Sequence, residues 1–506
     1  MKKTKYYYLI LLVTILVLVG RLIVLQVFEG EYYRALAVEN RVSLKIIKAD
    51  RGVIYDRFGE VLVRNSPQGR EYIFGEVLGH VLGYLGEADE NEIETGDYKL
   101  KDIVGKMGLE KEYDSKLRGI DGGILIEKDA NGQKIREIGK KESVAGESLT
   151  LSIDIGLQRK AYELMDGRPG ALIASEPETG EILALVSSPG FDFEKMEEAL
   201  VSKELPLFNR AIGGEYPPGS VFKIVTATAG LEENKVKADT KIEDTGEIRL
   251  GQWRFGNWYF DQYGQKEGVI NLVRAIARSN DIFFYKLGEA LGIEKLADWA
   301  KYFGLGSVTE IDLPGEANGL MPNPDWKKEF IGEDWYLGDT YISSIGQGNI
   351  LMTPLQVNQM TSVIASRGKW CQPYIKVKPF KGVTLPRCQE LDISQSSLDL
   401  VTEGMKQVCE SGGTAWPFFN FSVKGNRIYV AGKTGTAEFG EIGASDIKAG
   451  KTHAWFTGFA PLPSGRDKPV EKPNIVMTVL MEAGGEGSNQ AAPVARDLLN
   501  YWFNRR

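Results

Sequence analysis

The sequence predicts an α+β protein: an antiparallel sheet with flanking helices and a helical subdomain, preceded by a transmembrane helix and a small, mostly β pedestal. Strand-like runs at residues 171–174 and 182–186 flank a Pro-Glu-Thr-Gly turn, which is typical of a β-hairpin. Residues from about 270 to 370 have mostly helical apolar spacing. Residues 9–28 form a long apolar run. Hairpin-linked strands with segregated helices favour an antiparallel sheet.

The apolar run is long enough to cross a bilayer, because twenty residues at 1.5 Å each span about 30 Å. Three lysines precede the run and two glutamates follow it. The positive-inside rule therefore predicts an N-terminus in the cytoplasm and the remaining chain outside it. A cleaved signal peptide is the alternative, since Ala35-Leu36-Ala37 has the A-x-A form, but that site lies well past the apolar run.

The pattern along the chain divides it into four parts. Residues 1–8 are expected to form a cytoplasmic tail and residues 9–28 the transmembrane helix. Residues 29–150 are charged, glycine-rich and irregular, and form the expected pedestal. Residues 151–506 form the main domain, which agrees with a chain too long for one ordinary domain.

Further elements of the main domain follow in chain order. A strand at residues 149–155 leads into a helix at 157–165, ahead of the hairpin. Pro217-Pro218-Gly219 ends a loop, after which a helix is expected. The remaining predicted elements are a helix at 220–233, strands at 455–459 and 475–480, and a helix at 491–503.

Composition excludes several classes of function. A net charge of −8 and a pI near 5.3 argue against nucleic acid as a partner. With only two histidines, a Ser-His-Asp triad has little room, so a serine nucleophile would need another base. No Cys/His cluster predicts a metal site. We expect Cys371 and Cys388 to be free buried thiols, although an oxidising compartment leaves their pairing open.

The first chemical motif is Ser220-Val221-Phe222-Lys223, an S-x-x-K at the start of a predicted helix. On a helix the serine and the lysine share a face and come within hydrogen-bond reach. The serine also sits among free backbone N–H groups that suit a developing oxyanion. Two other S-x-x-K sequences, at residues 366–369 and 445–448, are not expected to open helices because glycines interrupt or follow them.

Two further motifs are weak when taken alone. Lys433-Thr434-Gly435-Thr436 follows the apolar residues 428–431 and is therefore expected at a strand end, where the glycine would admit a ligand close to the backbone. Ser279-Asn280-Asp281 follows the helical stretch 272–278, and by itself it would more often be a helix cap.

Together, the three motifs have the order and rough spacing found in penicillin-binding proteins and serine β-lactamases. The flanking sequence resembles the penicillin-binding transpeptidase family over nearly the whole chain. The segment Arg51-Gly52-Val53-Ile54-Tyr55-Asp56-Arg57 resembles the opening of class B members, and Gly108-Leu109-Glu110 with Leu117-Arg118-Gly119 resembles their elongation-type branch. Other matching segments are Asn209-Arg210-Ala211, Tyr216-Pro217-Pro218-Gly219-Ser220, Gly338-Asp339-Thr340, Gly346-Gln347-Gly348, Thr353-Pro354-Leu355-Gln356 and residues 455–461.

The resemblance implies a peptidoglycan D,D-transpeptidase that works through a serine acyl-enzyme and is acylated by β-lactams. Ser220 would be the nucleophile and Lys223 its base, with a pKa about 3 units below the usual ~10.4. Ser279 would relay the proton to the leaving amine. Asp281 and Lys433 would orient this network. No cofactor or metal is implied, and carboxypeptidase hydrolysis is the expected side reaction.

Substrate binding is implied for the last motif. The hydroxyls of Thr434 and Thr436 would bind the substrate carboxylate, with Gly435 admitting it to the strand. Backbone N–H groups of Ser220 and Thr436 would form the oxyanion hole. The implied partners are peptidoglycan stem peptides, β-lactam antibiotics, the bacterial cytoplasmic (inner) membrane and a polytopic membrane glycosyltransferase.

Two departures from the family pattern stand out. Asp281 occupies a position where most members have Asn, which adds a negative charge beside two lysines. Only Gln68 and Gly69 separate Asn65-Ser66-Pro67 from Arg70-Glu71-Tyr72, where relatives usually carry a large head subdomain. The pedestal, of the family's dimerisation type, is therefore expected to be shortened.

Two other functions fit part of the sequence. A β-lactamase or β-lactam sensor shares the motifs, but the anchor and pedestal argue against the first, and the few residues before the span argue against the second. A non-catalytic scaffold of a wall-synthesis complex is disfavoured because all three motifs are present. Labelling by penicillin separates the scaffold from the enzyme.

Overall fold

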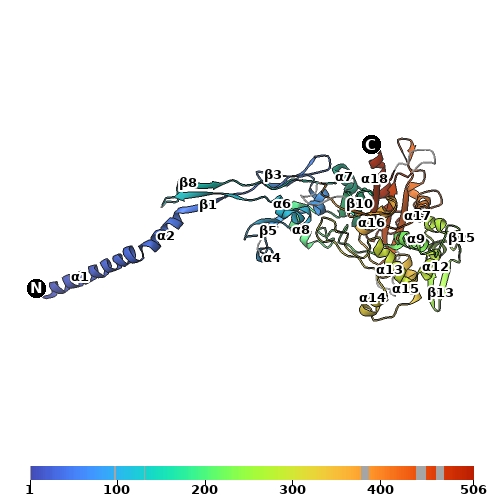
Figure 1. Ribbon diagram of the computed structural model, residues 1–506, viewed down its shortest axis with the longest axis horizontal. Coiled ribbons are helices and arrows are strands. Elements are labelled where there is room, and N and C mark those ends of the chain that lie inside the picture. The colour runs from blue at the N-terminus through green and yellow to red at the C-terminus, as the bar shows by residue number, and fades with distance from the viewer. Residues whose placement is uncertain are drawn as a thin grey trace. The chain divides into compact units, whose positions relative to one another are not determined.

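The N-terminus of the protein is one long apolar helix. In the computed structural model, which describes residues 2–95, 98–129, 131–377, 387–439, 452–462 and 472–505, α1 (Lys2–Ile23) continues into a π-helical turn, η1 (Val24–Phe28) (Figure 1). The segment Thr4–Phe28 has a mean hydropathy of 2.8, long and apolar enough to span a membrane. Arg21 is a charged residue within this segment, and its Nη2 lies 3.7 Å from Glu29 Oε2, just past the end of the segment.

The chain folds into two compact units whose boundaries interleave. The first unit comprises Met1–Gly52 and Ser115–Ser148. After α2 (Gly30–Arg41) it forms a three-stranded antiparallel sheet in the order β1-β7-β8. These strands are β1 (Val42–Ile47), β7 (Gly122–Lys128) and β8 (Lys134–Lys141). The expected domain boundary near residue 150 stays a prediction.

The second unit comprises Val53–Asp114 and Leu149–Arg506. Its first part contains a four-stranded sheet in the order β4-β3-β2-β9. Its strands are β2 (Ile54–Tyr55), β3 (Val61–Ser66), β4 (Gly69–Tyr72) and β9 (Leu149–Thr150). Because Ser66 pairs with Gly69, a tight turn joins β3 to β4. As expected, this turn stands where relatives usually carry a head subdomain. The predicted strand at 149–155 is shorter, since α7 already begins at Ile155.

A five-stranded sheet forms the centre of the second unit, in the order β11-β10-β22-β21-β20, and every pair in it is antiparallel. The predicted antiparallel sheet is confirmed. All residues of β10, β11 and β22 are buried, so both faces of the sheet centre are covered. The strands are β10 (Gly170–Ser175), β11 (Ile182–Ser188), β20 (Ala431–Glu438), β21 (Thr452–Ala460) and β22 (Ile475–Met481).

Helices from both ends of the main domain cover this sheet. The C-terminal α18 (Ala491–Asn504) packs on α7 (Ile155–Met165) and on the sheet, as Figure 1 shows. α16 (Pro354–Ala365) and α17 (Gln395–Val408) also pack against it. The predicted helical middle contains α11 (Leu272–Arg278), α12 (Asp281–Leu291), α13 (Ile293–Tyr302), α14 (Pro324–Phe330) and α15 (Leu337–Ser344).

The expectation for two of the cysteines was wrong, because Cys371 and Cys388 form a disulfide. β16 (Lys369–Cys371) and β17 (Cys388–Glu390) pair antiparallel and place these two residues directly opposite each other, with their Cα atoms 4.0 Å apart. The strand pairing therefore brings together thiols that the sequence separates by 17 positions. Cys409 is a free buried thiol.

Candidate active site

Ser220 lies in η4 (Gly219–Phe222), a 3-10 turn that leads directly into α9 (Lys223–Glu232). Gly219 has a φ of +54°, and a Cβ at this position would come within 2.9 Å of the Thr436 carbonyl oxygen. The glycine thus permits both the left-handed turn and the close approach of this turn to β20. Ser220 is half-buried, whereas Lys223 is completely buried. The predicted helix start is confirmed.

The second motif forms the turn between α11 and α12. Ser279 ends α11 in the left-handed region, with a φ of +53°. Asn280 then caps α12, and its Oδ1 accepts a hydrogen bond from the Phe283 backbone N–H at 2.9 Å. A non-glycine residue with positive φ is held there only by its surroundings. Ser279, Asn280 and Asp281 are all buried.

The third motif lies inside a strand and not at its end, so that expectation was wrong. β20 begins at Ala431 and runs to Glu438, with Lys433 and Gly435 in its middle. The apolar residues before it, which resemble a strand, extend into β20 only at its first residue. β20 is an edge strand of the sheet, and a Cβ at Gly435 would lie 3.1 Å from the Pro218 carbonyl oxygen. The glycine therefore lets η4 approach this edge.

The three motifs converge on the hydroxyl of Ser279. Lys433 Nζ donates to Ser279 Oγ at 2.9 Å, and Lys223 Nζ lies 3.3 Å from the same atom. Lys223 Nζ also donates to the Ser279 carbonyl at 2.9 Å and to Asp281 Oδ1 at 2.6 Å. Two buried lysines thus share one serine, and one of them has a carboxylate partner. No hydrogen bond among the described residues joins Lys223 to Ser220.

Burial is the largest electrostatic effect in this cluster. It lowers the pKa of Lys223, while the neighbouring Asp281 carboxylate acts in the opposite direction. Burial and the charge of Lys223 lower the pKa of Lys433 well below its usual value, and Asp281 again opposes this. Lys223 also lies 5.4 Å from the centroid of the Phe284 ring. Both lysines are therefore biased toward the neutral form that a base needs.

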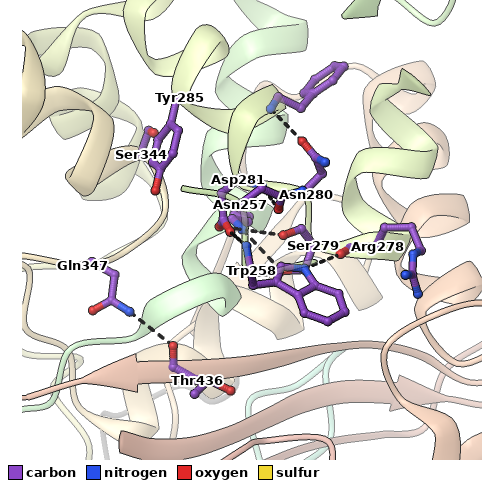
Figure 2. A network of polar contacts seen from close by, with 12 residues as sticks. Asn257, Trp258, Arg278, Ser279, Asn280, Asp281, Tyr285, Ser344, Gln347 and Thr436 are labelled. Atoms are coloured by element: carbon purple, nitrogen blue, oxygen red, sulfur yellow. Dashed lines mark hydrogen bonds and ion pairs between the residues drawn. The ribbon is translucent and has the colours of Figure 1, made fainter. Parts of the chain in front are cut away.

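β20 also contacts η4, the turn that carries Ser220. Thr436 is exposed, and its carbonyl accepts a hydrogen bond from Gln347 Nε2 at 3.2 Å, as Figure 2 shows. Because the N–H and C=O of one strand residue point to the same side, the Thr436 N–H also points out of the sheet edge. Thr434 is buried, and its hydroxyl lies 2.7 Å from Thr414 Oγ1.

The two other S-x-x-K sequences differ from the first. Ser366 follows the last residue of α16, and its hydroxyl oxygen lies 2.7 Å from the Ser362 carbonyl oxygen and 2.8 Å from that of Lys369, either of which can accept its hydrogen bond. Its lysine lies on β16 and donates to the Glu178 carbonyl. This motif opens no helix, as expected. Residues 445–448 lie outside the described residues.

Residues outside the three motifs also contact the cluster. Asn257 and Trp258 lie against Asp281, and Gln347 reaches β20 (Figure 2). Gln347 belongs to a segment that the family resemblance had singled out without a role. Asn257 carried no sequence signal, because a lone Asn-Trp pair in an irregular stretch has no motif.

Comparison with known proteins agrees with this geometry. The penicillin binding protein transpeptidase domain matches residues 170–500, and the penicillin-binding protein dimerisation domain matches residues 66–151. The chain belongs to the penicillin-binding protein family. Peptidoglycan D,D-transpeptidase MrdA of Acinetobacter baumannii is 33% identical over 503 residues, which cover 92% of this chain and 71% of the relative. The chain is therefore a class B penicillin-binding protein of the elongation type.

Solved structures agree with the fold of this penicillin-binding protein. The structure of Pseudomonas aeruginosa PBP2 in complex with WCK 5153 has a TM-score of 0.77 at 33% identity, covering 91% of this chain and 96% of that one. A chain of a peptidoglycan synthase complex that coordinates polymerization and crosslinking has a TM-score of 0.78 at 27% identity, covering 99% and 98%. The predicted transpeptidase fold is confirmed, and the apolar helix suits a single-pass membrane anchor.

Proposed function

We propose that this elongation-type penicillin-binding protein cross-links peptidoglycan by D,D-transpeptidation, with Ser220 as the nucleophile. The observation that carries the proposal is that Lys223 and Lys433 meet at the Ser279 hydroxyl, and that Lys223 directly follows the turn that carries Ser220. Burial lowers the pKa of both lysines, and perturbed pKa values of this kind favour a role in proton transfer.

Acylation begins with the Ser220 hydroxyl. Its oxygen attacks the carbonyl carbon of the penultimate D-alanine of a stem peptide, while neutral Lys223 takes the proton. The C–N bond to the terminal D-alanine then breaks. Ser279, which lies within hydrogen-bond reach of Lys223, relays the proton to the leaving amine. The products are free D-alanine and an ester on Ser220.

Deacylation reverses these roles. The amine of a second stem peptide attacks the ester carbonyl, a C–N bond forms, and the C–O bond to Ser220 breaks. The proton lost by the amine returns to the Ser220 oxygen through the same lysine. In both steps the negative charge on the carbonyl oxygen is stabilised by the backbone N–H groups of Ser220 and Thr436.

Substrate binding is assigned to β20. The exposed Thr436 and the neighbouring Thr434 offer hydroxyls for the terminal carboxylate. Gly435 lets the turn that carries Ser220 approach this strand, which brings the nucleophile beside the groups that bind the substrate. The outward-facing groups of an edge strand also suit an extended peptide, which would align as one more strand.

The topology follows from the anchor. Three lysines precede the apolar helix and two glutamates follow it, so we infer a cytoplasmic N-terminus and an extracytoplasmic catalytic domain. This inner-membrane placement brings Ser220 to the side where peptidoglycan lies. A reporter that works only outside the cytoplasm should be active when fused after Arg506, and activity of a cytoplasm-only reporter would contradict this.

The inferred partner is a polytopic membrane glycosyltransferase that supplies the glycan strands. One similar structure belongs to a peptidoglycan synthase complex, and it covers nearly the whole of this chain, including the apolar helix. The tight turn between β3 and β4 leaves the membrane helix and the first compact unit as the contact surface. Co-purification that survives replacement of residues 1–28 by a cleaved signal peptide would show that the helix is not needed.

A fluorescent penicillin tests the enzymatic function directly. The antibiotic should label the wild-type protein at Ser220, and the label should persist because the tethered product blocks the acceptor amine. Ser220→Ala should abolish labelling, whereas the matched variant Ser366→Ala should retain it. Rapid turnover of penicillin would favour a β-lactamase instead, and the absence of any label would favour a scaffold.

A further inference from the structure

The carboxylate of Asp281 is held from two sides. Its Oδ1 accepts the hydrogen bond from Lys223 Nζ at 2.6 Å, and its Oδ2 accepts one from the Trp258 backbone N–H at 3.1 Å. The backbone N–H of Asp281 donates to Asn257 Oδ1 at 3.2 Å. Figure 2 shows Asn257 and Trp258 beside Asp281 and the Ser279 turn. Neither residue belongs to the three motifs.

Asn257 is itself fixed on its other side. It is completely buried, and its Nδ2 donates to Asp244 Oδ2 at 2.9 Å. Asp244 ends β12 (Lys241–Asp244) and also accepts hydrogen bonds from the Gly246 N–H at 2.8 Å and the Glu267 N–H at 2.9 Å. The Asn257 N–H donates to the Gly246 carbonyl. All polar groups of this amide are thus paired, so Asn257 has one rigid orientation.

The indole of Trp258 supports the same turn. Its Nε1 donates to the Arg278 carbonyl at 2.9 Å, one residue before Ser279. The Arg278 guanidinium lies 5.5 Å from the Trp258 ring and binds the Glu267 carboxylate at 2.5 Å. The segment that begins α10 (Trp258–Tyr263) therefore contacts the last residue of the second motif and the residue just before the motif.

We propose that Asn257 and the Trp258 backbone N–H form a clamp, anchored on Asp244, that keeps the Asp281 carboxylate aimed at Lys223. Asn257 is in this sense a positioning residue of the active site. The inference rests on the proposed function, because it gives Asp281 a defined part in controlling the base. It also explains how an aspartate is accommodated here, since Trp258 supplies the second hydrogen bond that its extra oxygen needs.

The groups around Lys223 and Asp281 act on the charges of this pair in defined directions. Lys223 is faced by Asp281 from α12 and by Lys433 from β20. Asp281 is faced by both lysines and by Tyr285, whose pKa burial and the Asp281 charge raise. The Asp281 anion stabilises the Lys223 ammonium while the Trp258 N–H holds the carboxylate 2.6 Å from Lys223 Nζ. Without that N–H the carboxylate can turn away from the ammonium, so the pKa of Lys223 should fall.

Trp258 allows a test that removes one backbone N–H. It occupies the first position of α10, where proline is well tolerated. The preceding Asn257 has φ −102° and ψ 130°, which is the extended conformation that a residue before proline prefers. Trp258→Pro thus deletes the N–H and the indole, whereas the matched control Trp258→Ala deletes only the indole.

Two readouts on the full-length protein in detergent separate the outcomes. The pKa of Lys223 is read by NMR of lysine labelled at Cε, with the resonance assigned by its loss in Lys223→Met. It should be lower in Trp258→Pro than in Trp258→Ala by roughly half a unit or more. The pH midpoint of penicillin acylation should be lower in the proline variant by the same amount, because neutral Lys223 then forms at lower pH.

The clamp is refuted if Trp258→Pro and Trp258→Ala, both folded, have the same Lys223 pKa. It is also refuted if the difference between them persists unchanged in an Asp281→Ala background, because the effect would then not pass through Asp281. Should the proline variant fail to fold, Asn257→Ala takes its place. Its control is Asn323→Ala, which likewise removes a side-chain oxygen that accepts a hydrogen bond from a backbone N–H, here that of Trp326 at the start of α14. Failure of the proposed function is a separate result, since penicillin would then not label Ser220 while the lysine titration is still measured.

Discussion

Asp281→Asn removes the negative charge beside Lys223 and keeps the size of the side chain. In the native protein Lys223 Nζ lies 2.6 Å from Asp281 Oδ1, and both side chains are buried. An opposite charge at such a distance changes a pKa by about 1–3 units. Two unit charges about 4 Å apart interact by about 4 kcal/mol at an effective dielectric constant of about 20. This energy corresponds to about 3 pKa units, which is the upper end of that range.

We therefore expect the pKa of Lys223 to fall by at least about 1 unit in Asp281→Asn. Neutral Lys223 could accept a hydrogen bond from the new amide, while the amide oxygen keeps the bond from the Trp258 N–H. The rate of acylation rises with pH as Lys223 loses its proton, so this limb of the profile should move to lower pH. At a fixed pH below both midpoints, the fraction of neutral Lys223 rises about 10-fold for each unit by which its pKa falls.

The assay is the second-order rate constant for labelling by a fluorescent penicillin, measured from mildly acidic to alkaline pH on wild type and Asp281→Asn. Asp339→Asn, which removes a carboxylate bound to Lys327 in the helical part, is a matched charge control and should leave the midpoint unchanged. An unmoved midpoint in Asp281→Asn would mean that Asp281 does not set the protonation of the base. A shift to higher pH would reverse the assigned sign.

Three further predictions concern the fold around the site. Gly219→Ala should slow penicillin labelling at least about 10-fold without unfolding the protein. The added Cβ would come within 2.9 Å of the Thr436 carbonyl oxygen and push the Ser220 turn away from β20. Labelling at the wild-type rate would contradict this close approach. Glu110→Ala should cost about 3–5 kcal/mol in denaturant unfolding, since it leaves the buried Arg70 without the carboxylate at 2.9 Å; a cost below about 1 kcal/mol would exclude a strong pair. Burial lowers the pKa of His80 to about 4. The neutral side chain therefore contributes about 3 kcal/mol to the free energy of unfolding, which is complete above the unfolded pKa near 6.5 and is lost as the pH falls toward 4. His80→Gln should make the melting temperature less dependent on pH between these two values.

The sequence alone identified every residue of the central cluster. Short motifs contain Ser220, Lys223, Ser279 and Lys433. Local structure sets the spacing within each motif, so the motifs can be recognised from the sequence without the fold. The membrane helix and the β10–β11 hairpin were also predictable, because apolar run length and turn chemistry act within a few residues. The short connection between β3 and β4 was predictable as well, because the sequence has too few residues there for the head subdomain that relatives usually carry.

Only the tertiary structure decided what depends on partners far apart in the chain. The strand that carries Lys433 begins later than the apolar residues suggest, because β20 is defined by its pairing with β21. Cys371 and Cys388 are bonded because β16 and β17 place them in register. Asn257 reaches Asp281 across 24 positions, and its role depends on a buried hydrogen-bond network that no local pattern encodes. Periodicity and motifs report on neighbours in sequence, whereas register, disulfide pairing and the burial of a polar side chain are fixed by contacts that form only when the chain has folded.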